Sequence, residues 1–296
     1  MWTLPKPSAD EAIDDLTTAF TKNDGSEIYP LTQSEKDAVK SIYKIYDDSL
    51  GRPKAELDGS ILSNELKAAL YSAYNEVQEG RRLQRLRDRL KLLAVRCPLC
   101  GIGPVTDLDH HLPRSRFKGL SIYARNLVPT CHSCNNKKRT VAGETPDQQF
   151  IHAYFDALPQ ERFLIADVSV SDAGITVNFR AEQTANMPQE AYDRISFQIE
   201  RLNLVERYRP EVNVFLESQK DSFDLVFGAE ENADRLRNFL ILSARSHERS
   251  FGLNDWRTSL FYGLAACDAF CTGGFRKALT RNSNAGHMSG SYIRKS

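Results

Sequence analysis

The feature that most constrains this chain is a set of four cysteines arranged as two CxxC pairs. Cys97 and Cys100 form the first pair, Cys131 and Cys134 form the second, and 30 residues separate the pairs. A CxxC turn lets two sulfurs from one short stretch of backbone reach the same metal ion, and zinc favours four such ligands in a tetrahedron. The spacing therefore predicts a structural Zn²⁺ site that brackets an insert and leaves no open position for a reactive water.

The composition is that of a globular protein of 296 residues, with 41% hydrophobic and 26% charged residues. No run of eighteen apolar residues occurs, so we expect no membrane-spanning helix and no membrane partner. Residues 1–7 lack the apolar stretch of a signal peptide, which favours a cytoplasmic location. With four of the six cysteines in CxxC pairs, metal binding is a better explanation than disulfides.

Positive charge is concentrated around the cysteine pairs, although the formal net charge is zero. Residues 81–140 hold 14 of the 39 Lys and Arg residues but only 3 of the 39 Asp and Glu residues. A basic segment gathered on one motif indicates a footprint for a polyanion such as nucleic acid. For residues 81–91 alone, a solvated helix face explains the charge equally well.

Apolar spacing predicts a mostly helical chain. Helices are expected at about 10–20, 32–48, 189–208, 210–227, 231–249 and 254–280, and from 63 to about 95 as one long helix or two that meet near Gly80. Thr32 and Glu35 fit a capping box, while Pro210 should stop the helix before it and Asn254 should cap the last one. Alternating apolar residues between 163 and 179 predict a β-hairpin.

The insert between the cysteine pairs carries residues suited to phosphodiester hydrolysis. That reaction needs a base for water and a cation for the charged transition state. Three stretches, 108–115 (LDHHLPRS), 126–129 (NLVP) and 134–138 (CNNKK), together resemble the HNH, or ββα-metal, endonuclease family over about 45 residues. In that family the first two stretches are strands and the third begins a helix.

The resemblance implies a role for five residues. Asp109 and Asn135 would hold a single divalent cation, Mg²⁺ or Mn²⁺, in an oxygen-rich shell. His110 would be the general base, and Asn126 would hold the loop and orient His110. Lys138 would lie near the scissile phosphate.

His111 is the alternative base, because some members of the family use a His-His step in which the second histidine takes the proton. Pro113, three residues after His110, and the availability of Asp109 as a ligand favour His110 instead. Backbone phosphates are expected to contact four basic residues of the motif: Arg114, Arg116, Lys137 and Arg139.

These features predict an α+β fold, mostly helical, with an embedded ββα-metal HNH module, a four-cysteine zinc site and a small C-terminal β-hairpin. The expected regions are an N-terminal helical part (1–90), the HNH module (91–145), a C-terminal hairpin and helical domain (146–280) and a disordered tail (281–296). The expected function is a metal-dependent endonuclease that cleaves DNA. The alternatives are a non-catalytic zinc-stabilised nucleic-acid-binding module and an RNA or tRNA nuclease on the same scaffold.

Outside the motif the chain resembles, more loosely, bacterial HNH nucleases of anti-phage defence, such as the nuclease subunit of Septu-type systems, which works with an ATPase. This resemblance implies a defence role and an ATPase partner, since the chain itself contains no P-loop. A modification-dependent restriction enzyme is the rival interpretation.

Overall fold

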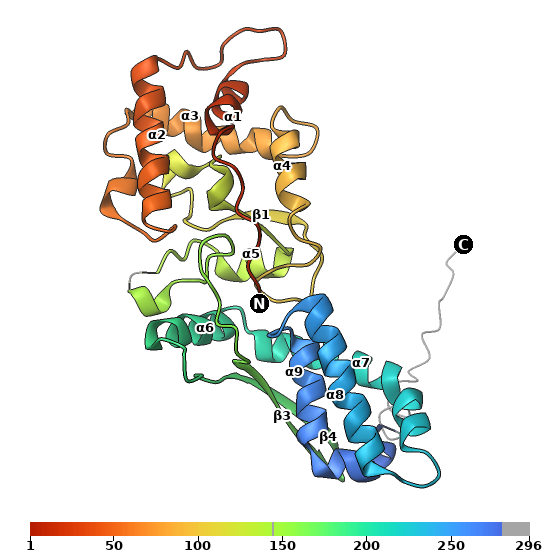
Figure 1. Ribbon diagram of the computed structural model, residues 1–296. Coiled ribbons are helices and arrows are strands. Elements are labelled where there is room, and N and C mark those ends of the chain that lie inside the picture. The colour runs from red at the N-terminus through yellow and green to blue at the C-terminus, as the bar shows by residue number, and fades with distance from the viewer. Residues whose placement is uncertain (144, 280–296) are drawn as a thin grey trace, which may run out of the picture. The chain divides into compact units, whose positions relative to one another are not determined.

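The computed structural model describes residues 1–143 and 145–279 (Figure 1). The chain divides into two compact units: unit 1 comprises Met1–Pro159 and Asn186–Leu202, and unit 2 comprises Gln160–Ala185 and Asn203–Ser296. The fold class is α+β, because helices predominate and each unit contains one two-stranded antiparallel sheet in its described part. No helix of the described ranges is long and apolar enough to cross a membrane.

Unit 1 begins with four helices, which are α1 (Ala12–Phe20), α2 (Gln33–Asp48), α3 (Asn64–Ala73) and α4 (Gln84–Lys91). The capping box predicted for α2 is confirmed, since Thr32 and Glu35 exchange their side-chain and backbone hydrogen bonds. Of the two expectations for residues 63–95, the structure has the pair of helices. A 3₁₀ segment, η2 (Tyr74–Val77), follows α3, and Gly80 takes a left-handed φ of 72° before α4 begins.

The four helices share one hydrophobic core with the segment that follows the first CxxC pair. Its fully buried members include Leu16, Ile42, Leu66, Leu70, Leu112 and Leu120. The compact units therefore do not follow the expected boundary near residue 90, because both sides of that boundary bury their apolar side chains together. Helix α6 (Gln189–Arg201) also belongs to unit 1, where Arg194 pairs with Asp156 at 2.6 Å and Gln198 accepts a hydrogen bond from the backbone of Ile151.

The predicted ββα arrangement lies in unit 1. Strand β1 (Asp107–His110) pairs with β2 (Leu127–Thr130), and α5 (His132–Lys138) follows directly. Between the strands run two 3₁₀ turns, η3 (Lys118–Leu120) and η4 (Ala124–Asn126). β1 is thus shorter than the expected 108–115, because the chain turns away into this buried loop after His110.

Unit 2 is built on the predicted hairpin of β3 (Leu164–Ser171) and β4 (Gly174–Ala181). In the part of unit 2 that the structure describes, the hairpin is accompanied by the helices α7 (Leu204–Phe227), α8 (Ala233–Phe251) and α9 (Trp256–Ala266). Helix α9 packs along β3, α7 contacts β4, and α8 packs against α7 and α9 (Figure 1). Aromatic pairs fill the space between them, such as Phe179 with Tyr208 at 4.9 Å and Phe215 with Phe261 at 5.4 Å between ring centroids.

Two helix boundaries in this part of the chain differ from expectation. The break expected at Pro210 lies at Asn203, whose left-handed φ of 51° separates α6 from α7. Pro210 lies at an exposed position inside α7, and the helix continues through it. Asp255, and not Asn254, caps α9, because the Asn254 side chain instead accepts the backbone N–H groups of Phe163 and Leu164.

The last expected helix is interrupted at one residue. Helix α9 stops at Ala266, and helical backbone resumes at 268 and continues to 279, with a short π-helical segment, η6 (Phe270–Gly274), inside it. The tail expected at 281–296 lies outside the described residues.

Candidate functional site

The four CxxC cysteines form one buried cluster in unit 1. Their sulfur atoms all lie within 4.8 Å of one another, and none of the four is in a disulfide. Four thiols in this arrangement can hold a metal ion such as zinc. Gly103 makes the approach possible, because a Cβ there would lie 2.9 Å from the Cβ of Cys131. The Ile102 N–H donates to the Cys100 sulfur at 3.4 Å, a contact that stabilises a metal-binding thiolate.

The cluster adjoins the ββα arrangement through the second CxxC pair. Cys131 follows β2 and is the N-cap of α5, and Cys134 lies in the first turn of that helix. Along β1, side chains alternate, so Asp107 and Asp109 share one face while His110 lies on the other. The helix is thereby held beside the strand face that carries the two carboxylates.

His110 is held in one orientation and one tautomer. Its Nε2 lies 2.8 Å from the Ser121 carbonyl oxygen, which can only accept, so Nε2 carries the proton and Nδ1 carries the lone pair. The ring packs against Tyr74 at 4.4 Å between centroids, and the Tyr74 hydroxyl donates to the Leu108 carbonyl at 2.6 Å. Burial lowers the pKa of His110 to about 3. The imidazole is therefore neutral at pH 7, the form that can accept a proton.

Asn126 closes the loop between the two strands. Its Oδ1 accepts the Leu112 N–H at 2.8 Å, and its Nδ2 donates to the carbonyl oxygens of Leu112 at 3.0 Å and Leu120 at 3.2 Å. The side chain is fully buried. Because Leu120 precedes Ser121, whose carbonyl holds His110, Asn126 is connected to His110 through the loop backbone.

Asp109 and Lys138 form a buried ion pair. The Lys138 Nζ lies 3.1 Å from the Asp109 carboxylate and donates to the His110 carbonyl at 2.6 Å. Only 2% of the Lys138 side chain is exposed, so it does not reach the surface where a phosphate was expected to meet it. Burial raises the pKa of Asp109, and the Lys138 ammonium opposes that rise.

Asn135, the other expected cation ligand, contacts Asp107 rather than Asp109. Its Nδ2 donates to the Asp107 carboxylate at 2.9 Å, and the His132 ring nitrogen Nδ1 lies 3.1 Å from the same oxygen. Burial opposes deprotonation of Asp107, but hydrogen bonds from Asn135 and its other neighbours outweigh it and lower the pKa. Sequence reasoning did not single out Asp107, although its position two residues before Asp109 puts it on the same strand face.

His111, the alternative base, is buried among different partners. Its backbone N–H donates to the Asn126 carbonyl at 2.8 Å, and its ring lies 4.0 Å from the ring of His152. Burial holds the pKa of His111 well below its usual range. Both histidines of the step are therefore neutral, and they differ in their surroundings.

The four basic residues expected to meet phosphates differ in how freely they can do so. The Arg114 guanidinium contacts two aromatic rings, with its central carbon 4.4 Å from the centroid of Tyr71 and 4.7 Å from that of Tyr74. Arg116 and Arg139 are exposed and Lys137 is half-buried. Arg116 and Arg139 are the pair best exposed to a polyanion.

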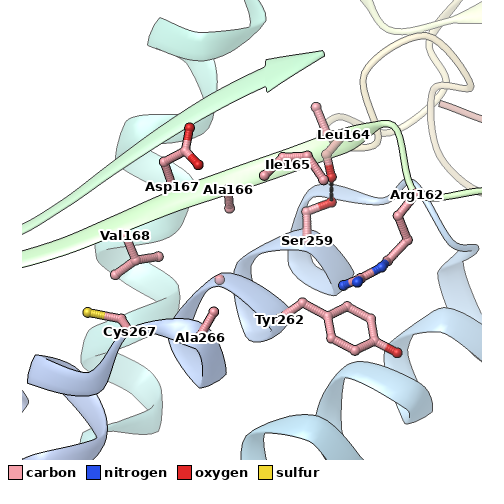
Figure 2. Close-up of a pocket in the computed structure, with 11 residues that line it drawn as sticks. Arg162, Leu164, Ile165, Ala166, Asp167, Val168, Ser259, Tyr262, Ala266 and Cys267 are labelled. Carbon is pink, nitrogen blue, oxygen red and sulfur yellow. Dashed lines mark hydrogen bonds between the residues drawn. The ribbon is translucent and has the colours of Figure 1, made fainter. Parts of the chain in front are cut away.

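Unit 2 contains a separate pocket of about 350 Å³ between β3 and one face of α9 (Figure 2). Ser259 on its wall donates to the Leu164 carbonyl at 2.7 Å, and Arg162 lies over the Tyr262 ring at 4.1 Å. None of the residues that line the pocket is a predicted site residue. The pocket is therefore not part of the ββα site.

Comparison with known proteins gives a partial likeness. The chain is 34% identical over 143 residues to protein ea31 of Escherichia phage lambda, a match that covers 46% of this chain and 48% of the phage protein. The chain thus spans about half the length of the curated relative it matches. No family model and no solved structure matches the chain.

Proposed function

We propose that this protein is a metal-dependent endonuclease of the HNH type that hydrolyses phosphodiester bonds in DNA. The observation that carries the proposal is the combination, on one β1–β2–α5 arrangement, of a neutral histidine with a fixed tautomer and a strand face that bears carboxylates. His110 can accept a proton at Nδ1, because its Nε2–H is committed to Ser121. A binding module without catalysis would have no need for a base held in this way.

The donor atoms beside α5 suit a hard divalent cation. Asp109, Asp107 and Asn135 all end in oxygen ligands, which Mg²⁺ and Mn²⁺ prefer. The Lys138 ammonium lies 3.1 Å from the Asp109 carboxylate, so a cation bound there would share that carboxylate with Lys138. Asp109 and Asn135 would hold the cation, which would supply stabilisation of the negative charge that develops on the phosphate. The four-cysteine cluster would hold a structural Zn²⁺ and take no part in the chemistry.

The surrounding residues define what the rest of the site would do. Ser121 and Asn126 keep the His110 ring in place, while Lys138 holds the end of β1 through the His110 carbonyl. Arg116 and Arg139 are exposed on the same module and would contact the DNA backbone, a salt-dependent interaction without sequence preference.

The test is plasmid cleavage by His110→Gln in the presence of Mg²⁺ or Mn²⁺. Glutamine keeps an N–H that can reach the Ser121 carbonyl but cannot act as a base, so the fold should survive while cleavage falls by about 100-fold or more. His247→Gln in unit 2 is the matched control and should cut like the wild type. The proposal fails if the wild type does not cut any nucleic acid, or if His110→Gln cuts as well as the control.

The same assay separates the alternatives. His111→Gln should lose less activity than His110→Gln, and the reverse order would make His111 the base. Parallel substrates of double-stranded DNA, single-stranded DNA and structured RNA distinguish a DNA nuclease from an RNA or tRNA nuclease.

A further inference from the structure

A directional chain of hydrogen bonds runs through the interior of unit 1 from His152 to Asn126. The His152 Nδ1 accepts the backbone N–H of Tyr154 at 3.1 Å, so a neutral His152 carries its proton on Nε2. That Nε2–H donates to the Tyr46 hydroxyl oxygen at 2.8 Å, and the Tyr46 hydroxyl in turn donates to the Asn126 Oδ1 at 3.0 Å. His152, Tyr46 and Asn126 are each fully buried.

The end of α2 is shaped to admit the His152 ring. Gly51, just after this helix, has a left-handed φ of 74°, and its N–H donates to the Tyr46 carbonyl at 2.9 Å. A Cβ at Gly51 would lie 2.3 Å from the Cδ2 atom of His152, which no side chain could tolerate. Glycine at this position therefore serves both the turn and the close approach of the histidine to Tyr46.

The His152 end of this chain of hydrogen bonds is anchored on α6. The His152 backbone N–H donates to the Asp156 carboxylate at 2.6 Å, and both guanidinium nitrogens of Arg194 bind the same carboxylate at 2.8 and 2.6 Å. A two-pronged arginine–carboxylate contact fixes geometry as well as charge. His152 is thus held on a rigid support and not on a free loop.

The Asn126 end of this chain of hydrogen bonds reaches the loop that orients His110. Asn126 receives the Tyr46 hydroxyl on the same Oδ1 that accepts the Leu112 N–H, while its Nδ2 holds Leu120. The next carbonyl along, that of Ser121, is the one that binds the His110 Nε2–H. From the His152 ring to the His110 ring, the connection consists of hydrogen bonds, the side chains of Tyr46 and Asn126, and the backbone from Leu120 to Ser121.

We propose that His152 and Tyr46 are positioning residues for His110, which they orient by fixing the side-chain amide of Asn126. This inference rests on the proposed nuclease function for its activity readout, but its structural content concerns the tautomer of His110 alone. Without the Tyr46 hydroxyl, the Asn126 Oδ1 loses a hydrogen-bond donor and the buried His152 Nε2–H loses its contact with Tyr46. The loop then gains freedom and Ser121 no longer holds one tautomer of His110.

Tyr46→Phe is the first variant, because it removes only the hydroxyl that links the two ends. Tyr43→Phe is its matched control: Tyr43 lies one turn earlier on α2, is also buried, and its hydroxyl has no hydrogen-bond partner among the described residues. We expect Tyr46→Phe to lower kcat by about tenfold to 100-fold with little change in KM, while Tyr43→Phe cuts like the wild type.

His152 is tested by rescue. His152→Gln keeps an N–H near the position of Nε2 and should retain most of the activity, whereas His152→Leu should lose as much as Tyr46→Phe. Because the residues act in series, the double variant with Tyr46→Phe and His152→Leu should be no worse than either single variant.

The spectroscopic readout is the ring ¹⁵N signal of His110 in protein labelled at its six histidines. The wild type and Tyr43→Phe should show protonated Nε2 and unprotonated Nδ1 on His110, and Tyr46→Phe should show the two tautomers averaging. If Tyr46→Phe gives the same His110 spectrum as the control, the relay does not act on His110 and the inference is overturned, whether or not cleavage changes. A wild type without nuclease activity would defeat the proposed function and leave this spectroscopic test in force.

Discussion

The two units differ in what their buried polar groups do. In unit 2 these groups gather where α9 begins and hold that helix to β3: Asn254 binds the backbone of the strand, and Ser259 donates to the Leu164 carbonyl. In unit 1 they converge on one loop and one histidine, through Asn126, Lys138 and their partners.

The difference concerns how much buried polarity each unit has to satisfy. Polar groups that stabilise a contact between two elements can be few and local, as in unit 2. Unit 1 buries an ion pair, two neutral histidines and a hydrogen-bonded relay within a short stretch, an arrangement that costs stability unless each member is satisfied. We infer that unit 1 retains this costly arrangement for the site it contains.

One tryptophan lies in each unit, which lets the comparison be tested. Trp2 donates its backbone N–H to Pro98 inside the first CxxC pair, and Trp256 is buried at the start of α9. Single-tryptophan variants, Trp256→Phe and Trp2→Phe, therefore report unfolding of unit 1 and unit 2 separately.

The largest effect is expected from loss of the metal. Cys134→Ser should release zinc and lower the free energy of unfolding reported by Trp2 by on the order of 5 kcal/mol, because metal binding at such a site is coupled to folding. Cys271→Ser, which changes a buried cysteine of unit 2, is the control. Zinc content by mass spectrometry and thermal melts of both single-tryptophan forms provide the measurement. Full stability in Cys134→Ser after zinc is lost would contradict a structural metal.

The next effect concerns the buried ion pair. Lys138→Met leaves the Asp109 carboxylate buried without its partner, which should destabilise unit 1 by about 3–5 kcal/mol in urea unfolding followed at Trp2. Lys137→Met, on the neighbouring and more exposed lysine, should change stability by less than about 0.5 kcal/mol. Equal effects of the two variants would mean that Lys138 is not buried against Asp109.

Local patterns predicted part of this structure. The CxxC spacing, the capping box at Thr32 and the hairpin in unit 2 each depend on residues close together in the sequence, and all three were predicted. The partners in the site could not be predicted in this way. The burial of Lys138 against Asp109 depends on how α5 packs on β1, and the contact of His152 with Tyr46 joins residues 106 positions apart. Asn203 ends α6 in a left-handed backbone conformation, which asparagine adopts more readily than most residues but which its presence alone does not locate in a sequence.

The last effect is a pH dependence, which should distinguish the units. Burial lowers the pKa of His152 to about 3, below its usual value of 6.5. Between these values the unfolded chain binds a proton that the folded one does not. His152 therefore contributes stability that is present above pH 6.5 and is lost as the pH falls, by up to about 1.4 kcal/mol per pH unit.

The measurement is the slope of the free energy of unfolding against pH, reported by Trp2 for unit 1. Because His110 and His111 add to the same slope, the informative quantity is the difference in slope between the wild type and His152→Gln. Between pH 4 and 6 that difference in slope should approach the value for uptake of one proton on unfolding. In contrast, His247→Gln should change only the slope that Trp256 reports for unit 2. An unchanged slope in His152→Gln would show that His152 is protonated in the folded protein, and its Nδ1 could not then accept the Tyr154 N–H.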